Sequence, residues 1–208
     1  GGVDSSLCAA LLQEQGYEVL GITMQLSDDS REMNGVSSAA TDARRVADFL
    51  GIEHVVADFR TLFSDKVVDY FLMEYLTART PNPCVICNRF LKFGELLSFA
   101  REKGADFLAT GHYVRIEKEE DGSFALKKGR DEKKDQSYVL YRLPREILSH
   151  ILFPLGSYKK EETRALAQKL FLPVANKAES QEICFVPEDD YKAYLSQHRP
   201  NCFHTGDI

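Results

Sequence analysis

The sequence lacks the features that mark membrane proteins and repeat proteins. No run approaches the roughly 18 apolar residues that a membrane-spanning helix needs, and the first residues show no basic segment followed by an apolar one. Heptads, internal repeats and low-complexity segments are absent as well. We therefore expect a cytoplasmic, globular chain with no membrane partner.

The sequence also has no Met at its start, no apolar strand before Gly1, and no clear stop signal over residues 201–208. We expect it to be a piece of a longer protein. Its 208 residues, 44% of them hydrophobic and 28% charged, are enough for an ordinary globular core. A chain of this length buries about 70% of its unfolded surface, so it needs no disulfide or metal merely to fold.

A surplus of basic residues is missing too. The net charge is −6 and the pI near 5.4, which argues against a surface that coats nucleic acid generally but leaves room for a local basic patch. Segment 127–134 holds five basic and two acidic residues, a composition typical of a solvated hairpin end. Lys159 and Lys160 are predicted to face solvent on a helix.

The chain has five cysteines, an odd number. In a chain of this size an odd count favours thiols, a metal site or a redox pair over a secreted disulfide framework. Cys84 and Cys87 form a CxxC motif that follows two prolines, and this motif alone is ambiguous between a redox pair, half of a zinc site and cluster ligands. They are predicted to lie in a loop just before a helix, whose dipole would favour the thiolate. Cys8, Cys184 and Cys202, taken singly, are typical of structural or incidental cysteines.

Short β-rich runs alternate with amphipathic stretches, which predicts βαβ units: an α/β fold with a parallel sheet and helices on both faces. The expected helices are 6–15, 41–50, 61–78, 90–103, 161–170 and 187–197. The expected strands are 18–24, 54–58, 107–110 and 172–175, with a β-hairpin of 113–117 and 124–127. We expect a catalytic domain over 1–143, with the hairpin excursion near 113–127, and a helical extension over 144–208.

Residues 1–6, Gly-Gly-Val-Asp-Ser-Ser, lead directly into a helix. Glycines let backbone N–H groups approach phosphate oxygens, and a helix N-terminus carries partial positive charge. A simple capped helix start would look the same. A Walker loop is excluded because no Gly-Lys-Ser/Thr follows. The segment instead resembles the PP-loop of ATP pyrophosphatases, which split ATP into AMP and pyrophosphate.

Five motifs in this order, GGVDSS, TPNPCVICN, ATGHYVR, KDQSYVLY and SQEICF, closely resemble the tRNA-specific 2-thiouridylases over the whole chain. The resemblance implies an ATP-dependent conversion of the wobble uridine of Lys, Glu and Gln tRNAs to 2-thiouridine. It also implies ATP with Mg²⁺, a PP-loop fold and further C-terminal β domains that this chain lacks. The sulfur source, a donor protein or sulfide, stays open.

The resemblance assigns roles residue by residue. The ATP phosphates would be held by Gly1, Gly2, Val3, Asp4 and Ser5, and the nucleoside by Met24 and Gly111. The target base would be contacted by Asn82, Pro83 and Cys84, and the tRNA by His112, Lys134, Asp135 and Gln136. Cys87 would be the nucleophile and Cys184 the persulfide carrier, ending in a Cys87–Cys184 disulfide.

Cys84 departs from the family, many of whose members have Asp at this position. Three thiols, Cys84, Cys87 and Cys184, could hold a [4Fe–4S] cluster that carries the extra sulfide instead of a persulfide. A spare thiol at 84 and a zinc site are the other readings, and zinc needs a fourth ligand. Another PP-loop ligase or amidotransferase, or a non-catalytic iron–sulfur or zinc RNA-binding module, remains an alternative function.

Overall fold

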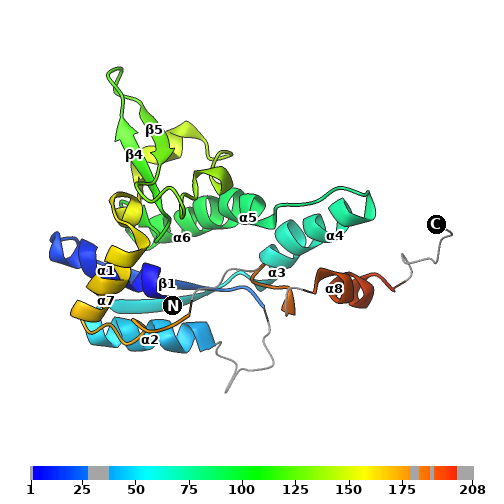
Figure 1. The fold of residues 1–208 in the computed structure, drawn as a ribbon, viewed down its shortest axis with the longest axis horizontal. Helices are drawn as coiled ribbons and strands as arrows, with labels where there is room; N and C mark the ends of the chain where they lie inside the picture. Colours follow the sequence, from blue (N-terminus) through cyan, green and yellow to red (C-terminus); the bar gives the residue numbers. More distant parts are fainter. Residues whose placement is uncertain (1, 28–37, 179–182, 188–189, 201–208) are drawn as a thin grey trace.

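The computed structural model describes residues 2–27, 38–178, 183–187 and 190–200. Gly1 and Cys202, which the sequence analysis singles out, lie outside these ranges. The chain forms parallel strand pairs covered by helices, with the β4–β5 hairpin projecting at the top and an arm that contains α4 and α8 extending to the right (Figure 1). No helix of the described ranges is both long and apolar enough to pass through a bilayer.

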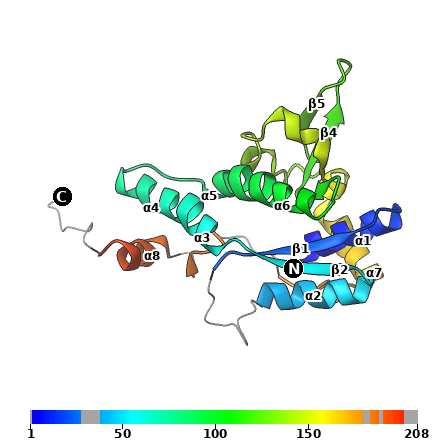
Figure 2. The same cartoon turned by 180° about the vertical axis from the view of Figure 1, so that it is seen from behind.

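The first half of the chain alternates helices and parallel strands, as the sequence predicts. Helix α1 (Val3–Glu14) is followed by β1 (Leu20–Gln25), α2 (Ser38–Leu50) and β2 (Glu53–Asp58). Strands β1 and β2 pair in parallel, from Leu20 opposite Glu53 to Gln25 opposite Asp58. Helix α2 runs beside this pair in both views (Figures 1 and 2) and also contacts α1, where the side-chain amide of Gln13 donates to the carbonyl of Leu50 at 3.0 Å.

Two helical stretches follow, each interrupted by a π-helical segment. The first comprises α3 (Arg60–Phe63), η1 (Ser64–Val68) and α4 (Asp69–Leu76), and the second α5 (Pro83–Ile86), η2 (Cys87–Glu95) and α6 (Leu96–Glu102). The second stretch begins seven residues earlier than expected, because Pro83 is its first helical residue, where a missing N–H costs nothing. Cys84 and Cys87 therefore lie inside the helical stretch, and the prediction of a loop there is wrong.

The second half contributes a second parallel pair and the expected hairpin. β3 (Leu108–Ala109) pairs in parallel with β6 (Ile151–Leu152), and β4 (Val114–Lys118) pairs antiparallel with β5 (Phe124–Lys128). Short helices η3 (Ser137–Val139), η4 (Arg145–His150) and η5 (Pro154–Ser157) connect them. Within the described ranges the parallel pairs form separate two-stranded sheets rather than one continuous sheet.

Helices α7 (Lys160–Lys169) and α8 (Tyr191–His198) complete the described chain. The strand predicted at 172–175 is wrong, because the amide of Ala175 bonds the carbonyl of Leu172 in a turn. α7 packs on α1 in one apolar cluster that includes Leu7, Leu11 and Ala167. α8 lies beside α4, with the rings of Tyr75 and Tyr191 stacked at 5.0 Å (Figure 1). The division into domains at residue 143 stays a prediction.

Candidate functional site

The predicted phosphate loop is an open helix N-terminus. Gly2 is extended and exposed, with no atom within 4 Å of the place where a Cβ would stand. α1 starts at Val3, and the hydroxyl of Ser6 donates to the carbonyl of Gly2 at 2.8 Å. The first-turn N–H groups of a helix have no partner within it, so they point outward, available to an anion. This geometry fits a polyphosphate.

The carboxyl end of β3 abuts this loop. A Cβ at residue 111 would lie 2.8 Å from Cβ of Asp4 and 2.9 Å from its carbonyl carbon, so only glycine fits there without movement. Two of the predicted ATP residues, Asp4 and Gly111, are thus in direct contact. Met24, in β1, is half-buried and packs against the main apolar cluster. Its contact with the nucleoside stays a prediction.

The Asp4 carboxylate is held by a partly buried polar network. The ammonium of Lys160 lies 2.7 Å from each carboxylate oxygen, and the hydroxyl of Tyr113 donates to one of them at 2.9 Å. The Tyr113 oxygen is also 2.8 Å from the hydroxyl of Thr163. Lys160 is only 8% exposed, so the expectation that it faces solvent is wrong. The ion pair with a residue 156 positions away pulls it inward, and no local sequence pattern could have indicated this.

The segment 134–136, predicted to contact tRNA, is closely hydrogen-bonded to its surroundings. The carboxylate of Asp135 accepts bonds from the amides of Gly129 and Ser137 and from the Ser137 hydroxyl. The side-chain oxygen of Gln136 accepts from the Tyr113 amide at 3.0 Å. Asp135 and Gln136 thus have structural roles, and RNA contacts at these residues stay predictions.

The cysteine motif begins the second helical stretch. The side-chain oxygen of Asn82 caps α5 by accepting from the amide of Val85 at 3.4 Å. Cys84 is exposed, whereas Cys87 is buried at the start of η2. π-helical segments are rare and frequently occur at functional sites. The π-helical segment η2 begins at Cys87, a predicted catalytic residue.

Cys184 approaches the same place from the far end of the chain. It lies in a turn closed by a bond from the amide of Val186 to the carbonyl of Ile183. Phe185 packs against the apolar cluster that contains Cys87 and Phe63. Cys84 and Cys184 each lie close enough to Cys87 to raise its pKa electrostatically. The three predicted thiols are therefore brought together.

The pKa values of these thiols contradict the expectation of a stabilised thiolate at Cys87. Burial raises the pKa of Cys87 to about 11, although nearby Lys92 partly offsets the effect. The pKa of Cys184 is also raised, first by desolvation and then by Cys84. Cys87 lies in the second turn of the helical stretch rather than at its N-terminus, so desolvation outweighs the dipole.

A metal does not fit the thiols as they stand. In the part of the chain that the structure describes, no three His, Cys, Asp or Glu side chains are arranged to hold a metal ion. Cys84, Cys87 and Cys184 are all within that part.

His112 is a packed residue in this structure. Its ring is 9% exposed and lies 5.9 Å from the rings of both Phe93 and Phe153. Its Nδ1 is 2.7 Å from the hydroxyl of Thr110. Burial, followed by the charge of Lys92, holds the pKa of His112 well below its usual value, so the ring is neutral at pH 7. The geometry supplies a structural role, and its tRNA contact stays a prediction.

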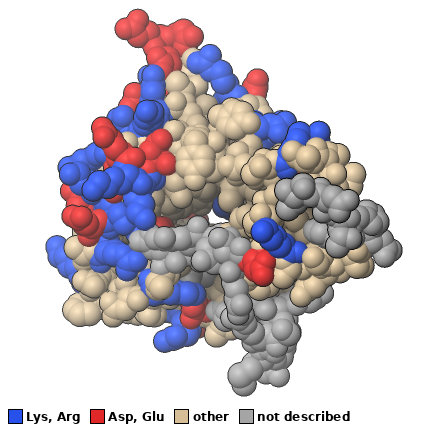
Figure 3. All heavy atoms as spheres, turned by 45° about the vertical axis from the view of Figure 1, so that its right-hand side comes forward, with Lys and Arg blue, Asp and Glu red and all other residues tan. Residues whose placement is uncertain are grey.

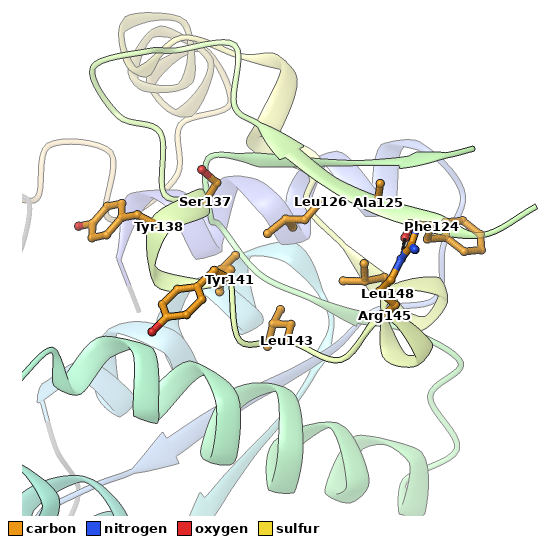
Figure 4. Close-up of a pocket in the computed structure, with 10 residues that line it drawn as sticks. Phe124, Ala125, Leu126, Ser137, Tyr138, Tyr141, Leu143, Arg145 and Leu148 are labelled. Carbon is orange, nitrogen blue, oxygen red and sulfur yellow. Dashed lines mark hydrogen bonds between the residues drawn. The ribbon is translucent and has the colours of Figure 1, made fainter. Parts of the chain in front are cut away.

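A hollow of about 490 Å³ lies between β5 and the segment that follows residue 136 (Figure 4). Leu126, Leu143 and Leu148 are among its apolar lining, while Tyr138 and Tyr141 stand at one end with 63% and 71% of their surface exposed. Figure 3 shows Lys and Arg side chains gathered along one margin of the face it presents, with Asp and Glu among them and uncharged atoms at the centre. Exposed aromatic rings are ready stacking partners for unpaired bases.

The parallel strand pairs, with an open helix N-terminus beside the end of one strand, define a domain of the Rossmann-like α/β class. A family model described as the tRNA methyl transferase HUP domain matches residues 1–188. The chain belongs to this family. The predicted fold class and family resemblance are confirmed.

Individual relatives point the same way. The chain is 56% identical over 206 residues to tRNA-specific 2-thiouridylase MnmA 1 of Caldanaerobacter subterraneus subsp. tengcongensis, covering 95% of this chain and 56% of that protein. It is 50% identical to tRNA-specific 2-thiouridylase MnmA of Clostridioides difficile, covering 99% of this chain and 59% of that protein. The chain thus spans less than two thirds of these relatives.

A solved structure supports the fold. It is titled as a predicted subunit of tRNA methyltransferase from Methanocaldococcus jannaschii and matches with a TM-score of 0.51 at 22% identity. The match covers 81% of this chain and 72% of that one.

Proposed function

We propose that this chain is the ATP-dependent catalytic part of a tRNA 2-thiouridylase. The observation that carries the proposal is the proximity of Cys87 and Cys84 to Cys184, which is distant in the sequence, in a domain that also has an open phosphate loop. Relatives that are named tRNA-specific 2-thiouridylases support it. Such thiols must stay reduced between turnovers, so we propose a cytoplasmic location.

In this proposal the first-turn amides of α1, with Gly1, Gly2, Val3, Asp4 and Ser5, bind the phosphates of ATP. Met24 and Gly111 contact its nucleoside. Mg²⁺ would neutralise charge on the phosphates when bound. Asp4 is paired with Lys160, and it acts by holding the Lys160 ammonium beside the loop. A buried ammonium at this position supplies positive charge that water screens little.

The 2-oxygen of uridine is a poor leaving group, and the proposed chemistry follows from this. The 2-oxygen of the uridine attacks the α-phosphorus of ATP and releases pyrophosphate, so that the oxygen leaves later as AMP. The outer sulfur of a persulfide on Cys184 attacks carbon 2 and expels AMP. Cys87 then attacks Sγ of Cys184, the persulfide bond breaks toward the transferred sulfur, and 2-thiouridine and a Cys87–Cys184 disulfide result. Sulfide that attacks Sγ of Cys184 in this disulfide leaves a persulfide on Cys184 and releases the Cys87 thiolate. In the other route a thiol reductant restores both cysteines, and a donor protein that carries a persulfide transfers its outer sulfur to Cys184.

RNA binding is proposed for two groups of residues. Asn82, Pro83 and Cys84 would contact the target base, and Lys134, Asp135, Gln136 and His112 the anticodon arm of Lys, Glu or Gln tRNA. The exposed rings of Tyr138 and Tyr141 beside this segment support an RNA-binding face, because unpaired bases stack on such rings.

An iron–sulfur cluster on Cys84, Cys87 and Cys184 is the competing sulfur carrier. The lack of a metal-holding arrangement in the described part of the chain favours the persulfide route. Anaerobic purification with iron and sulfide analysis distinguishes the two. Stoichiometric iron with absorption near 400 nm in the wild type, lost in Cys84→Ser, would reverse this preference.

The deciding experiment measures pyrophosphate release from ATP with and without an unmodified tRNA. We expect release that depends on the RNA and is lost in Asp4→Ala. Cys184→Ala and Cys87→Ala should still release pyrophosphate in a first turnover but form no 2-thiouridine, because these residues act after adenylation. RNA-independent release, or release followed by ligation of an amine, would favour another PP-loop enzyme.

A further inference from the structure

Both groups that hold the Asp4 carboxylate are anchored by one surface loop, residues 129–137. The amide of Tyr113 donates to the side-chain oxygen of Gln136 at 3.0 Å, and the amide of Gln136 donates back to the Tyr113 carbonyl at 3.2 Å. The amide of Lys160 donates to the carboxylate of Asp131 at 2.9 Å. Tyr113 and Lys160, the two residues that bond to the Asp4 carboxylate, are therefore both held by the same loop.

The loop is stiff and closely applied to Tyr113. Asp135 ties its two ends together, accepting from the amide of Gly129 at 2.9 Å and from the hydroxyl of Ser137 at 2.7 Å. A Cβ at Gly129 would overlap the Tyr113 carbonyl oxygen, so the two backbones touch. A close-packed contact of this kind passes a displacement on rather than absorbing it.

Tyr113 links this loop to the phosphate site. Its backbone is held on both sides by Gln136, while its hydroxyl, with the ring 3% exposed, donates to the Asp4 carboxylate. Asp4 in turn touches Gly111 and lies in the first turn of α1. A shift of the loop therefore moves a donor that is bonded to the phosphate loop.

We infer that Tyr113 is a positioning residue through which loop 129–137 sets the Asp4 carboxylate, so that RNA bound at this loop changes the affinity for ATP. The inference rests on the proposed function, which supplies both ligands. Coupling between two binding sites is reciprocal, so ATP changes the affinity for RNA by the same factor.

The test measures the dissociation constant of a non-hydrolysable ATP analogue, with and without a saturating anticodon stem–loop RNA that has uridine at the wobble position. We expect the RNA to change this constant about five-fold or more in the wild type. In Tyr113→Phe, which keeps the ring and removes the hydroxyl, the factor should fall toward one. Tyr158→Phe is the matched control, because Tyr158 packs against the same apolar cluster and should leave the factor at its wild-type value.

Gln136→Leu is a second variant, which removes the side-chain bond between the loop and the Tyr113 amide while leaving the hydroxyl in place. It decides the question if Tyr113→Phe does not fold, and its factor should also fall toward one at saturating RNA. A wild-type factor in both variants, or a wild-type protein in which neither ligand affects the other, overturns the inference. Failure of the proposed function has a different signature, which is the absence of RNA-dependent pyrophosphate release.

Discussion

The Lys160 ammonium lies 2.7 Å from both carboxylate oxygens of Asp4, and the two residues are 156 positions apart. The Lys160 side chain is 10% exposed and that of Asp4 33% exposed. This ion pair joins the first turn of α7 to the first turn of α1. It therefore connects helices from the start and from the second half of the described chain at the proposed phosphate site.

Replacing Lys160 with Met should weaken both folding and ATP binding. Breaking a fully buried pair costs about 3–5 kcal/mol, and partial exposure of Asp4 should reduce the loss of unfolding free energy here to about 2 kcal/mol. Thermal unfolding should show a midpoint about 5 °C lower. Lys159→Met is the matched control, since Lys159 is the exposed neighbour. Equal stability of the two variants would contradict a structural role for the pair.

Gly111→Ala should destabilise the protein although the change adds one methyl group. The new Cβ would stand 2.8 Å from Cβ of Asp4, so α1 or β3 must move. Overpacking of this kind costs about 1–3 kcal/mol, measurable by urea unfolding. Gly2→Ala provides the contrast, because the space at Gly2 is open and its backbone is extended. A wild-type denaturation midpoint in Gly111→Ala would show that the contact is looser than described.

Local sequence patterns predicted those helices and strands whose structure depends mainly on their own residues. The parallel strands and the hairpin turning at Gly122, with φ of +82°, are near their expected positions. Residues 172–175 show the limit of such patterns. Leu172, Val174 and Ala175 are buried, so the apolar run reports burial against α1 and α7 rather than a strand.

For the candidate site, the motifs named residues but could not indicate the contacts between them. The motifs identified Asp4, Gly111 and the three thiols, whereas Lys160 looked like an ordinary helix charge. Its burial depends on Asp4 and on the Asp131 carboxylate that holds its backbone, both distant in sequence. The pKa of Cys87 likewise depends on tertiary burial, which outweighs the local helix dipole.

Alkylation of the thiols should depend steeply on pH. A folded-state pKa of about 11 leaves little thiolate on Cys87 at neutral pH, and its rate with iodoacetamide should rise about tenfold per pH unit up to that value. Cys184, whose pKa is also raised, should rise similarly but faster in absolute terms because its side chain is exposed. Mass spectrometry of timed reactions assigns each site. Cys8, buried with a pKa of about 12, is the slow internal reference. A rate for Cys87 that levels off below pH 9 would contradict this prediction.

The absence of tryptophan from the sequence allows a direct test of the hollow beside β5. Tyr138→Trp introduces a single tryptophan, which can be excited selectively over tyrosine, at a side chain that is 63% exposed, where the larger ring needs no new space. If the hollow takes an unpaired base of the RNA, stacking should quench this fluorescence as the RNA saturates the protein. Tyr17→Trp, also exposed but near Phe107, is the matched control and should not be quenched.

Tyr138→Ala should weaken RNA binding about five-fold or more, since stacking contributes about 1–3 kcal/mol per base. Saturation of Tyr138→Trp by the RNA with unchanged fluorescence would exclude the hollow from the RNA-binding face.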